Sequence, residues 1–177
     1  MTRLRVAIII AFREFRDIEY FIPRDILSRA GARIATVSTE KGIAIGSDGG
    51  DAQVNLTAPQ VKIDDFDAVV FIGGAGMAKK LDNQDFQRIA KEAAEKGKIV
   101  GAICIAPALL AKAGVLSGKK ATVFSAPLDK SAIRILEKGG AEYTGEDVVI
   151  DAKVVTADGP GAARHFGEAL LELLTKK

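Results

Sequence analysis

The chain is poor in the residue types that hold metal ions and form disulfides. Its 177 residues include no tryptophan, one cysteine and one histidine. A single cysteine excludes an intrachain disulfide and a cysteine-rich metal cage, and a single histidine, His165, removes the usual zinc ligand sets. We therefore expect no metal site and no bound cofactor.

The chain also has no large excess of positive or negative charge, and its apolar runs are short. Lys and Arg number 25 against 23 Asp and Glu, which gives a net charge of +2. No basic run is longer than a pair, so nucleic acid is not expected as a partner. The apolar run before Phe12 has six residues, too few for a signal peptide or a membrane span. We expect a cytoplasmic protein without membrane contact, folded as a single domain over residues 1–177.

Short apolar strands alternate with helical patterns along the chain. This alternation predicts an α/β fold with a doubly wound, mostly parallel sheet and helices on both faces. Pro23 falls inside the first helix, which we expect to be kinked or to consist of a turn followed by a later helix. The expected strands are 5–11, 32–37, 67–72, 99–103 and 121–124. A hairpin or irregular excursion is expected at 42–52, and a hairpin of 148–150 with 154–157. Helices are expected over 83–96, 130–138 and 161–174, and two more are expected to end at Gly31 and at Ala113.

The apolar run Ile99–Leu110 carries the only cysteine, Cys104, at its centre. Its residue types predict a buried strand, a sharp reversal at the cysteine, and a helix that Pro107 can open, because proline suits the first helical turn. Ala102 and Ala106, two positions before and after the cysteine, are small enough to let strand and helix approach closely. This spacing is typical of a nucleophile elbow.

Two further features are expected at the same edge of the sheet as Cys104. Glu19 follows the first strand, and Gly73-Gly74 end a later one, while the functional crevice of such sheets lies at the carboxyl ends of the strands. The helix dipole and unpaired N–H groups favour the Cys104 thiolate, and the N–H groups of Ile105 and the glycine pair can stabilise an oxyanion. Glu19 can transfer a proton if apolar neighbours raise the pKa of its carboxyl.

Each of these residues also has a simpler interpretation. An unpaired cysteine in an apolar run is commonly a small buried hydrophobe, and Glu19 fits a solvated helix surface. Asp158–Gly161 fits a loop that starts the last helix, with a pocket wall as the alternative. His165 fits a surface or packed histidine better than a catalytic one.

Five stretches of the chain together carry a family pattern. They are Glu19–Pro23, Phe71–Gly74, Ala102–Pro107, Gly114–Thr122 and Asp158–Gly161. In this order they resemble the ThiJ/PfpI superfamily, which includes deglycase/chaperone-like proteins and PfpI-type intracellular proteases. The resemblance implies a flavodoxin-like sandwich, a homodimer or higher homo-oligomer, a reactive cysteine at the elbow and a glutamic acid hydrogen-bonded to its thiol. Carried over, these two are Cys104 and Glu19, with Gly74 and Ile105 as oxyanion donors.

The chain also departs from that family pattern. PfpI-type members have a histidine directly after the cysteine, where this chain has Ile105, and they draw a glutamate from a neighbouring subunit through a segment that is Ala75–Ala78 here. The deglycase-like branch often has a histidine after the next strand, and Val123–Pro127 contains none. Without a general-base histidine, peptidase activity is poorly supported.

The first hypothesis for function is therefore a cysteine-dependent enzyme of the glyoxalase III or deglycase type. Cys104 would add to a small reactive carbonyl such as methylglyoxal, and Glu19 would transfer the proton. The alternative is a redox-sensing or chaperone-like stress protein in which Cys104 is oxidised to a sulfinic acid. A PfpI-type intracellular peptidase ranks third.

Overall fold

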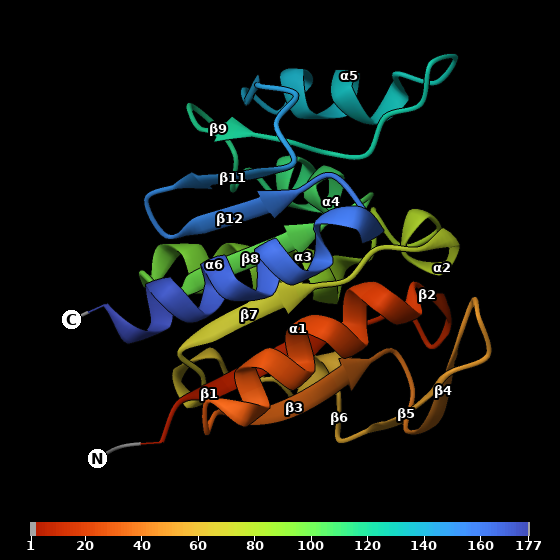
Figure 1. Cartoon of the computed structure of the whole chain (residues 1–177), viewed down its shortest axis with the longest axis vertical. Helices are drawn as coiled ribbons and strands as arrows, with labels where there is room; N and C mark the ends of the chain where they lie inside the picture. Colours follow the sequence, from red (N-terminus) through yellow and green to blue (C-terminus); the bar gives the residue numbers. More distant parts are fainter. Residues whose placement is uncertain (1–2, 177) are drawn as a thin grey trace.

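The computed structural model describes residues 3–176 and is built around a seven-stranded sheet (Figure 1). All neighbouring strands in this sheet run parallel except the two of the β11–β12 hairpin. The strands in sheet order are β11 (Val148–Asp151), β12 (Val154–Ala157), β8 (Ile99–Ile103), β7 (Ala68–Phe71), β1 (Arg5–Ile9), β3 (Arg33–Ser38) and β6 (Leu56–Thr57).

Helices cover both faces of the sheet. Apolar side chains of α1 (Asp17–Arg29) and α6 (Ala163–Thr175) pack on one face, and those of α3 (Gln84–Glu95) and α4 (Ala106–Lys112) on the other. The central strands β7 and β8 are buried along their whole length, which explains their continuous apolar sequence. The doubly wound α/β fold is confirmed. No helix within residues 3–176 combines the length and apolarity that crossing a bilayer requires.

Smaller elements flank this core. The stretch 42–52 is a hairpin and not an irregular excursion, because β4 (Gly42–Gly46) pairs antiparallel with β5 (Asp51–Val54), and β2 (Arg13–Phe15) pairs with β4. The remaining elements are β9 (Lys120–Ala121), β10 (Glu142–Tyr143), α2 (Ala75–Ala78), α5 (Ser131–Lys138) and the 3₁₀ turns η1 (Ala58–Gln60), η2 (Ile63–Asp65) and η3 (Pro160–Ala162).

The first helix runs unbroken through Pro23 and is not a turn followed by a later helix. Proline has no N–H, so the Glu19 carbonyl one turn earlier lacks its usual helical donor. Pro23 is nevertheless buried, because α6 packs closely against it: a methyl group on Gly167 would lie 3.0 Å from Pro23 Cα. This contact between α1 and α6 holds the helix that carries Glu19.

The strand expected over 121–124 is wrong beyond Ala121, where β9 ends. The N–H of Thr122 donates to the side-chain hydroxyl of Thr156 (3.0 Å), and the N–H of Phe124 donates to the Cys104 carbonyl (2.9 Å). Both N–H groups thus have hydrogen-bond partners that do not belong to a neighbouring strand. The segment therefore supports the turn at Cys104 and does not extend the strand.

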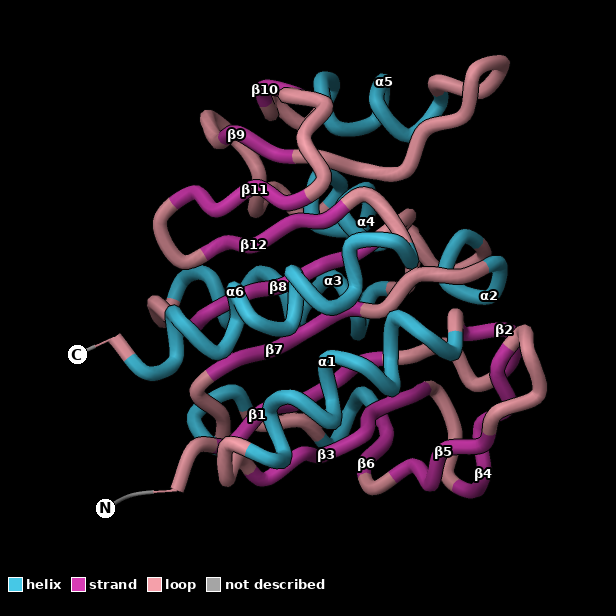
Figure 2. The backbone as a smooth tube through the Cα atoms, in the orientation of Figure 1, coloured by secondary structure: helices cyan, strands magenta, loops and turns pink. Residues whose placement is uncertain are grey.

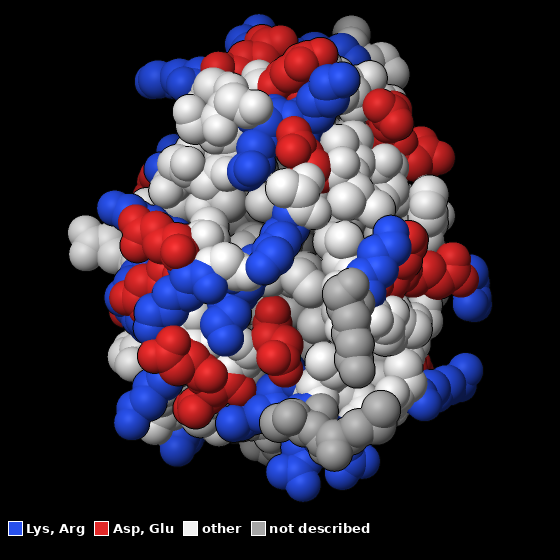
Figure 3. Space-filling view, turned by 90° about the vertical axis from the view of Figure 1, so that its left-hand side faces the viewer, with Lys and Arg blue, Asp and Glu red and all other residues white. Residues whose placement is uncertain are grey.

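The carboxyl ends of the parallel strands meet on one side of the molecule. On this side the chain continues from β1 through β2 to α1, and from β7, β8 and β12 to α2, α4 and η3. Figure 2 shows α2 and β2 together there. On the opposite side, basic and acidic side chains are intermingled rather than gathered by sign (Figure 3). In sheets of this kind the functional crevice lies at the carboxyl ends of the strands.

Candidate active site

Cys104 occupies the corner between β8 and α4 in a strained backbone conformation. Its φ is +64°, a left-handed value that is costly for a residue with a side chain. The corner is held from both sides: the Cys104 N–H donates to the Ala157 carbonyl (2.9 Å), and its own carbonyl accepts the N–H of Phe124 (2.9 Å). Ala102 and Ala106, both fully buried, leave room for the reversal. The chain thus turns sharply from strand to helix at Cys104.

Glu19 lies in the first turn of α1 and is fully buried, so it is not the solvated surface carboxylate of the simpler interpretation. Its Oε2 accepts the N–H of Gly73 (3.0 Å). Its Oε1 forms no hydrogen bond of good geometry within residues 3–176, although the Cys104 thiol lies close enough to lower the pKa of the carboxyl. A buried carboxyl with one free oxygen beside a thiol is suited to proton transfer.

Only glycine fits at position 73. A methyl group there would lie 2.6 Å from Cys104 Cβ and 2.7 Å from Glu19 Oε2. Both distances are shorter than non-bonded atoms tolerate, so a side chain would push the two groups apart. The absence of a side chain at Gly73 therefore sets how closely the thiol and the carboxyl approach.

The thiol and the carboxyl compete for one proton. Burial raises the pKa of Glu19 from 4.5 to about 7, and contacts with Cys104, Gly73 and Arg16 oppose this only in part. Burial and the adjacent Glu19 carboxylate raise the pKa of the Cys104 thiol to about 12. The pair therefore carries at most one negative charge near neutral pH, and a thiolate requires that Glu19 hold the proton.

Two backbone N–H groups lie near enough to the sulfur to affect its titration. The N–H groups of Ile105 and Gly74 both lower the pKa of the Cys104 thiol, but burial and Glu19 outweigh them. The expectation that the corner favours the thiolate is therefore wrong. The N–H of Gly73, which was expected to join them, donates to Glu19 instead. The predicted residues thus meet at one point, with Gly73 serving the carboxyl and Gly74 and Ile105 facing the sulfur.

These groups open into a pocket of about 640 Å³. Its size suits a small molecule. Several lining residues were not singled out from the sequence, among them Arg16, Ser47 and Phe124. Arg16 lies three residues before Glu19, about one helical turn away, and that spacing is the one signal that could have found it. Ser47 and Phe124 come from loops, whose positions depend on the whole fold.

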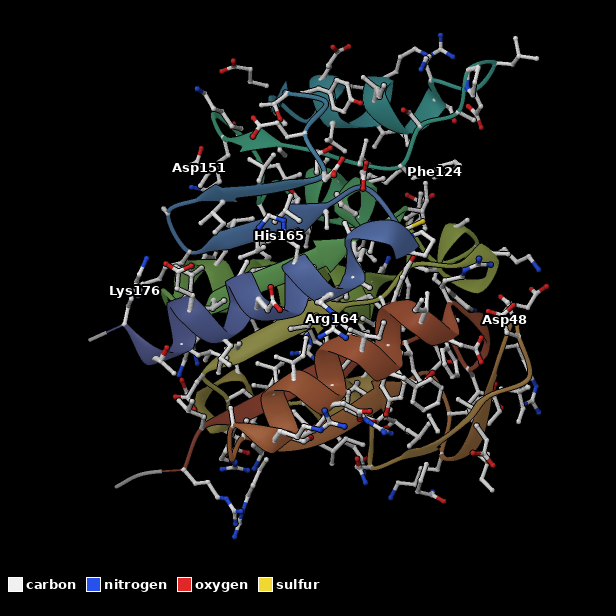
Figure 4. The ribbon with its side chains drawn as sticks, viewed as in Figure 1. Asp48, Phe124, Asp151, Arg164, His165 and Lys176 are labelled. Carbon is white, nitrogen blue, oxygen red and sulfur yellow. The ribbon has the colours of Figure 1, made fainter. Side chains whose placement is uncertain are left out.

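Pro160 also lines the pocket, so the Asp158–Gly161 segment forms part of the wall as well as preceding α6. His165 is exposed on α6 and does not line it. Figure 4 shows His165 on that helix, away from Phe124 at the carboxyl ends of the strands. Among the described residues, no group of three or more His, Cys, Asp or Glu side chains is placed to hold a metal ion.

The sequence is similar to several known proteins along nearly its whole length. It is 41% identical over 177 residues to an uncharacterized protein from Methanocaldococcus jannaschii, covering 99% of this chain and 85% of that one. It is 32% identical over 161 residues to deglycase PfpI from Pyrococcus furiosus, covering 91% of this chain and 94% of that one. A glutathione-independent glyoxalase from Caenorhabditis elegans is 27% identical, with 89% of this chain and 82% of that one covered.

A solved structure and a family model agree with these relatives. The crystal structure of a ThiJ/PfpI domain protein from Brachyspira murdochii superposes with a TM-score of 0.90 at 29% identity, covering 98% of each chain. This likeness confirms the flavodoxin-like arrangement. The model of the DJ-1/PfpI family matches residues 4–173. The resemblance seen in the sequence motifs is thereby confirmed, and the chain belongs to the DJ-1/PfpI family.

Proposed function

We propose that this protein is a cysteine-dependent enzyme that converts small α-oxoaldehydes to 2-hydroxy acids, an activity of the glyoxalase or deglycase type. The observation that carries the proposal is the fully buried Glu19 carboxyl, with a pKa of about 7, beside a thiol at a strained corner that opens into a pocket. Relatives named as deglycases and as a glyoxalase support the same reaction class.

In the first step the Cys104 sulfur attacks the aldehyde carbon and forms a C–S bond. The thiol proton passes to Glu19 and then to the former carbonyl oxygen, which gives a hemithioacetal. While that oxygen is negatively charged, the N–H groups of Gly74 and Ile105 stabilise it. A carboxyl whose pKa is near the ambient pH can both accept and release this proton.

In the second step Glu19 moves a proton between neighbouring carbons. Its carboxylate removes the hydrogen from the carbon bonded to sulfur and returns it to the adjacent ketone carbon. The hydroxyl proton of the hemithioacetal passes to the former ketone oxygen, which leaves a thioester of a 2-hydroxy acid. Water then cleaves the C–S bond and restores the thiol. The net reaction adds one water to the α-oxoaldehyde and consumes no oxidant or reductant.

The direct test is incubation with methylglyoxal and measurement of lactate by a stereospecific assay. Lactate is the readout because Lys and Arg side chains also remove methylglyoxal without forming it. We expect one lactate enantiomer in excess and no activity in Cys104→Ala or Glu19→Gln. Lactate formation at the wild-type rate by Cys104→Ala would overturn the proposal.

The same corner supports a second candidate, a peroxide-sensing role. Two N–H groups face the sulfur, and a protonated Glu19 can donate a hydrogen bond, so oxygens added to the sulfur would find donors. Each of two hydrogen peroxide molecules would transfer one oxygen to sulfur and leave as water, giving a sulfinic acid. Intact-mass measurement after mild peroxide should show two added oxygens on the wild type and none on Cys104→Ala. A wild type that gains no oxygen excludes this role.

A further inference from the structure

Arg16 lies beside the reacting groups but has no part in the reaction described above. It lines the same pocket as Cys104 and Glu19. Its N–H donates to the Gly73 carbonyl (3.0 Å), and its backbone packs against the next glycine, where an added methyl group would lie 2.6 Å from Arg16 N. The backbone of Arg16 is therefore fixed against the turn whose N–H groups serve the carboxyl and the sulfur.

The side chain of Arg16 is half-buried, and its charge is not paired by the protein. Its Nε is buried and has no hydrogen-bond partner within residues 3–176, and the side chain forms no salt bridge among those residues. A buried guanidinium N–H without an acceptor is costly unless a ligand supplies one. The pocket beside it is the place from which an acceptor can come.

The acidic side chains nearest to Arg16 in sequence are engaged elsewhere. Glu14 forms an ion pair with Lys79 (2.7 Å). The carboxylate of Asp17 accepts two backbone N–H groups of the β4–β5 turn (2.8 and 2.6 Å), and that of Glu19 accepts the backbone N–H of a glycine (3.0 Å). Among the described residues none of the three forms a salt bridge with Arg16, although Glu19 is near enough for Arg16 to lower the pKa of its carboxyl. The guanidinium therefore keeps donors for an anion in the pocket.

Besides Arg16 and the titrating Glu19, one further charged residue in the described part of the chain lines the pocket. Asp129, on the loop before α5, is exposed, and its carboxylate accepts the N–H of Ser131 (2.9 Å). An exposed charge is screened by water and salt, whereas the buried Nε of Arg16 is screened much less. Among the described residues that line the pocket, Arg16 is the one that carries a positive charge, and it lies beside the titrating pair of Glu19 and Cys104.

We propose that Arg16 binds a carboxylate of the substrate, so that the preferred substrates are small α-oxoaldehydes that also carry a carboxylate. This inference rests on the proposed function and names its substrate class. A guanidinium presents two parallel N–H donors that match a carboxylate, which suits this anion better than a single-point donor would. With the carboxylate on Arg16, the aldehyde at the other end of a short chain lies toward Cys104 in the same pocket.

The first experiment compares kcat/KM for methylglyoxal with that for 4,5-dioxopentanoate, an α-oxoaldehyde with a terminal carboxylate. We expect the wild type to prefer the carboxylated compound and Arg16→Gln to lose at least about tenfold of that preference, the usual effect of removing a charged hydrogen-bond partner. The ratio is the readout, because Arg16 also acts on the pKa of Glu19 and will change both rates. Arg16→Lys, which keeps the charge but not the planar pair of donors, should retain part of the preference.

Arg13→Gln is the matched control for loss of one positive charge. Arg13 lies three residues away, stacks on the Phe12 ring and does not line the pocket. We expect its substrate ratio to equal that of the wild type. A ratio that Arg16→Gln leaves unchanged, or that Arg13→Gln lowers equally, would overturn the assignment.

A binding measurement separates this inference from the proposed reaction. In Cys104→Ala, which cannot form an adduct, calorimetry with pyruvate and with the uncharged hydroxyacetone tests the anion contact alone. We expect pyruvate to bind more tightly, with an affinity that falls on adding salt and on the further change Arg16→Gln. That result without lactate formation by the wild type would reject the reaction but keep the anion site. Lactate formation together with equal binding of the two probes would reject the anion site.

Discussion

Glu19 and Cys104 are best treated as one titrating unit. Glu19 is fully buried and Cys104 is half-buried, and the negative charge of either disfavours the negative charge of the other. The first proton leaves the pair at a pH of about 7, and the second only near the high pKa of the thiol. The reactive form is therefore the singly ionised pair, in which one proton is shared between sulfur and oxygen.

This unit predicts the pH dependence of the reaction. We expect kcat/KM for methylglyoxal to rise as pH increases through about 7, because the pair must lose its first proton to become reactive. Initial rates of lactate formation between about pH 5 and 9 measure this limb. A limb centred near 4.5, the ordinary value for glutamic acid, would contradict the assignment to a buried carboxyl.

The same raised pKa predicts how stability depends on pH. Because burial raises the pKa of Glu19 in the folded state from 4.5 to about 7, stability present below the lower value is lost as pH rises through the upper one, in all about 3 kcal/mol. Glu19→Gln removes the titration, so we expect it to unfold at higher denaturant concentration than the wild type at pH about 8, with a smaller difference at about 5.

Glu95→Gln is the control for that measurement, since Glu95 is exposed at the end of α3. Its denaturation midpoint should follow that of the wild type at both pH values. If the denaturation midpoint of Glu19→Gln also equals that of the wild type at both pH values, ionisation of the Glu19 carboxyl does not lower the stability of the fold.

The elements around the pocket are fixed by close backbone contacts. At the end of α5, a methyl group on Gly139 would lie 2.8 Å from the Ala111 carbonyl oxygen and 2.9 Å from Ala111 Cβ in α4. Gly139→Ala therefore forces α5 away from α4, and we expect it to lower the free energy of unfolding by about 1–3 kcal/mol. Because Ser131 and Ile135 of α5 line the pocket, KM for the aldehyde should rise as well.

Gly161→Ala is the matched control, because nothing lies within 4 Å of a methyl group there. Urea denaturation compares the stability of the two variants. The kinetics of Gly139→Ala are compared with those of the wild type, because Gly161 belongs to the segment that forms part of the pocket wall. Equal stability of the two variants would show that α5 can shift without cost.

Local chemistry explains which elements the sequence could predict. The β8 strand and its corner follow from an apolar run, small residues around Cys104 and Pro107, and the end of β7 follows from its glycine pair. The strand after Ala121 was wrong because Thr122 bonds a distant side chain, which no local pattern reveals.

The residues of the site likewise fall into those that local sequence could predict and those that it could not. Cys104 and Glu19 were found because each sits next to a recognisable element start, and their family motifs are local. The role of Gly73 as donor to Glu19 and the place of Arg16 in the pocket depend on contacts between segments far apart in sequence. The sequence around Arg16 reads only as a charged loop.

At the scale of the whole molecule, one sheet separates two apolar cores. One core contains Ile89 of α3 and the other Leu170 of α6, both fully buried, and the strands contribute side chains to both. Because the two cores share their strands, unfolding of one core would expose to water the strands on which the other core is packed. We therefore expect the two cores to unfold together.

We therefore expect Ile89→Ala and Leu170→Ala each to lower the free energy of unfolding by about 2–5 kcal/mol and to shift one common transition. Far-UV circular dichroism and tyrosine fluorescence, followed through urea denaturation, should give coincident curves for both variants. Two separated transitions in either variant would mean that the cores unfold independently.

The turn between β4 and β5 gives the fold a means of changing its specificity over evolution. The Asp17 carboxylate at the start of α1 anchors the backbone of this turn, while Ser47 faces the pocket. Substitutions at Ser47 therefore alter the pocket wall without entering either core or displacing the elbow. A descendant of this chain could acquire a new substrate range through a single surface turn, and the same turn is the natural place to randomise in directed evolution.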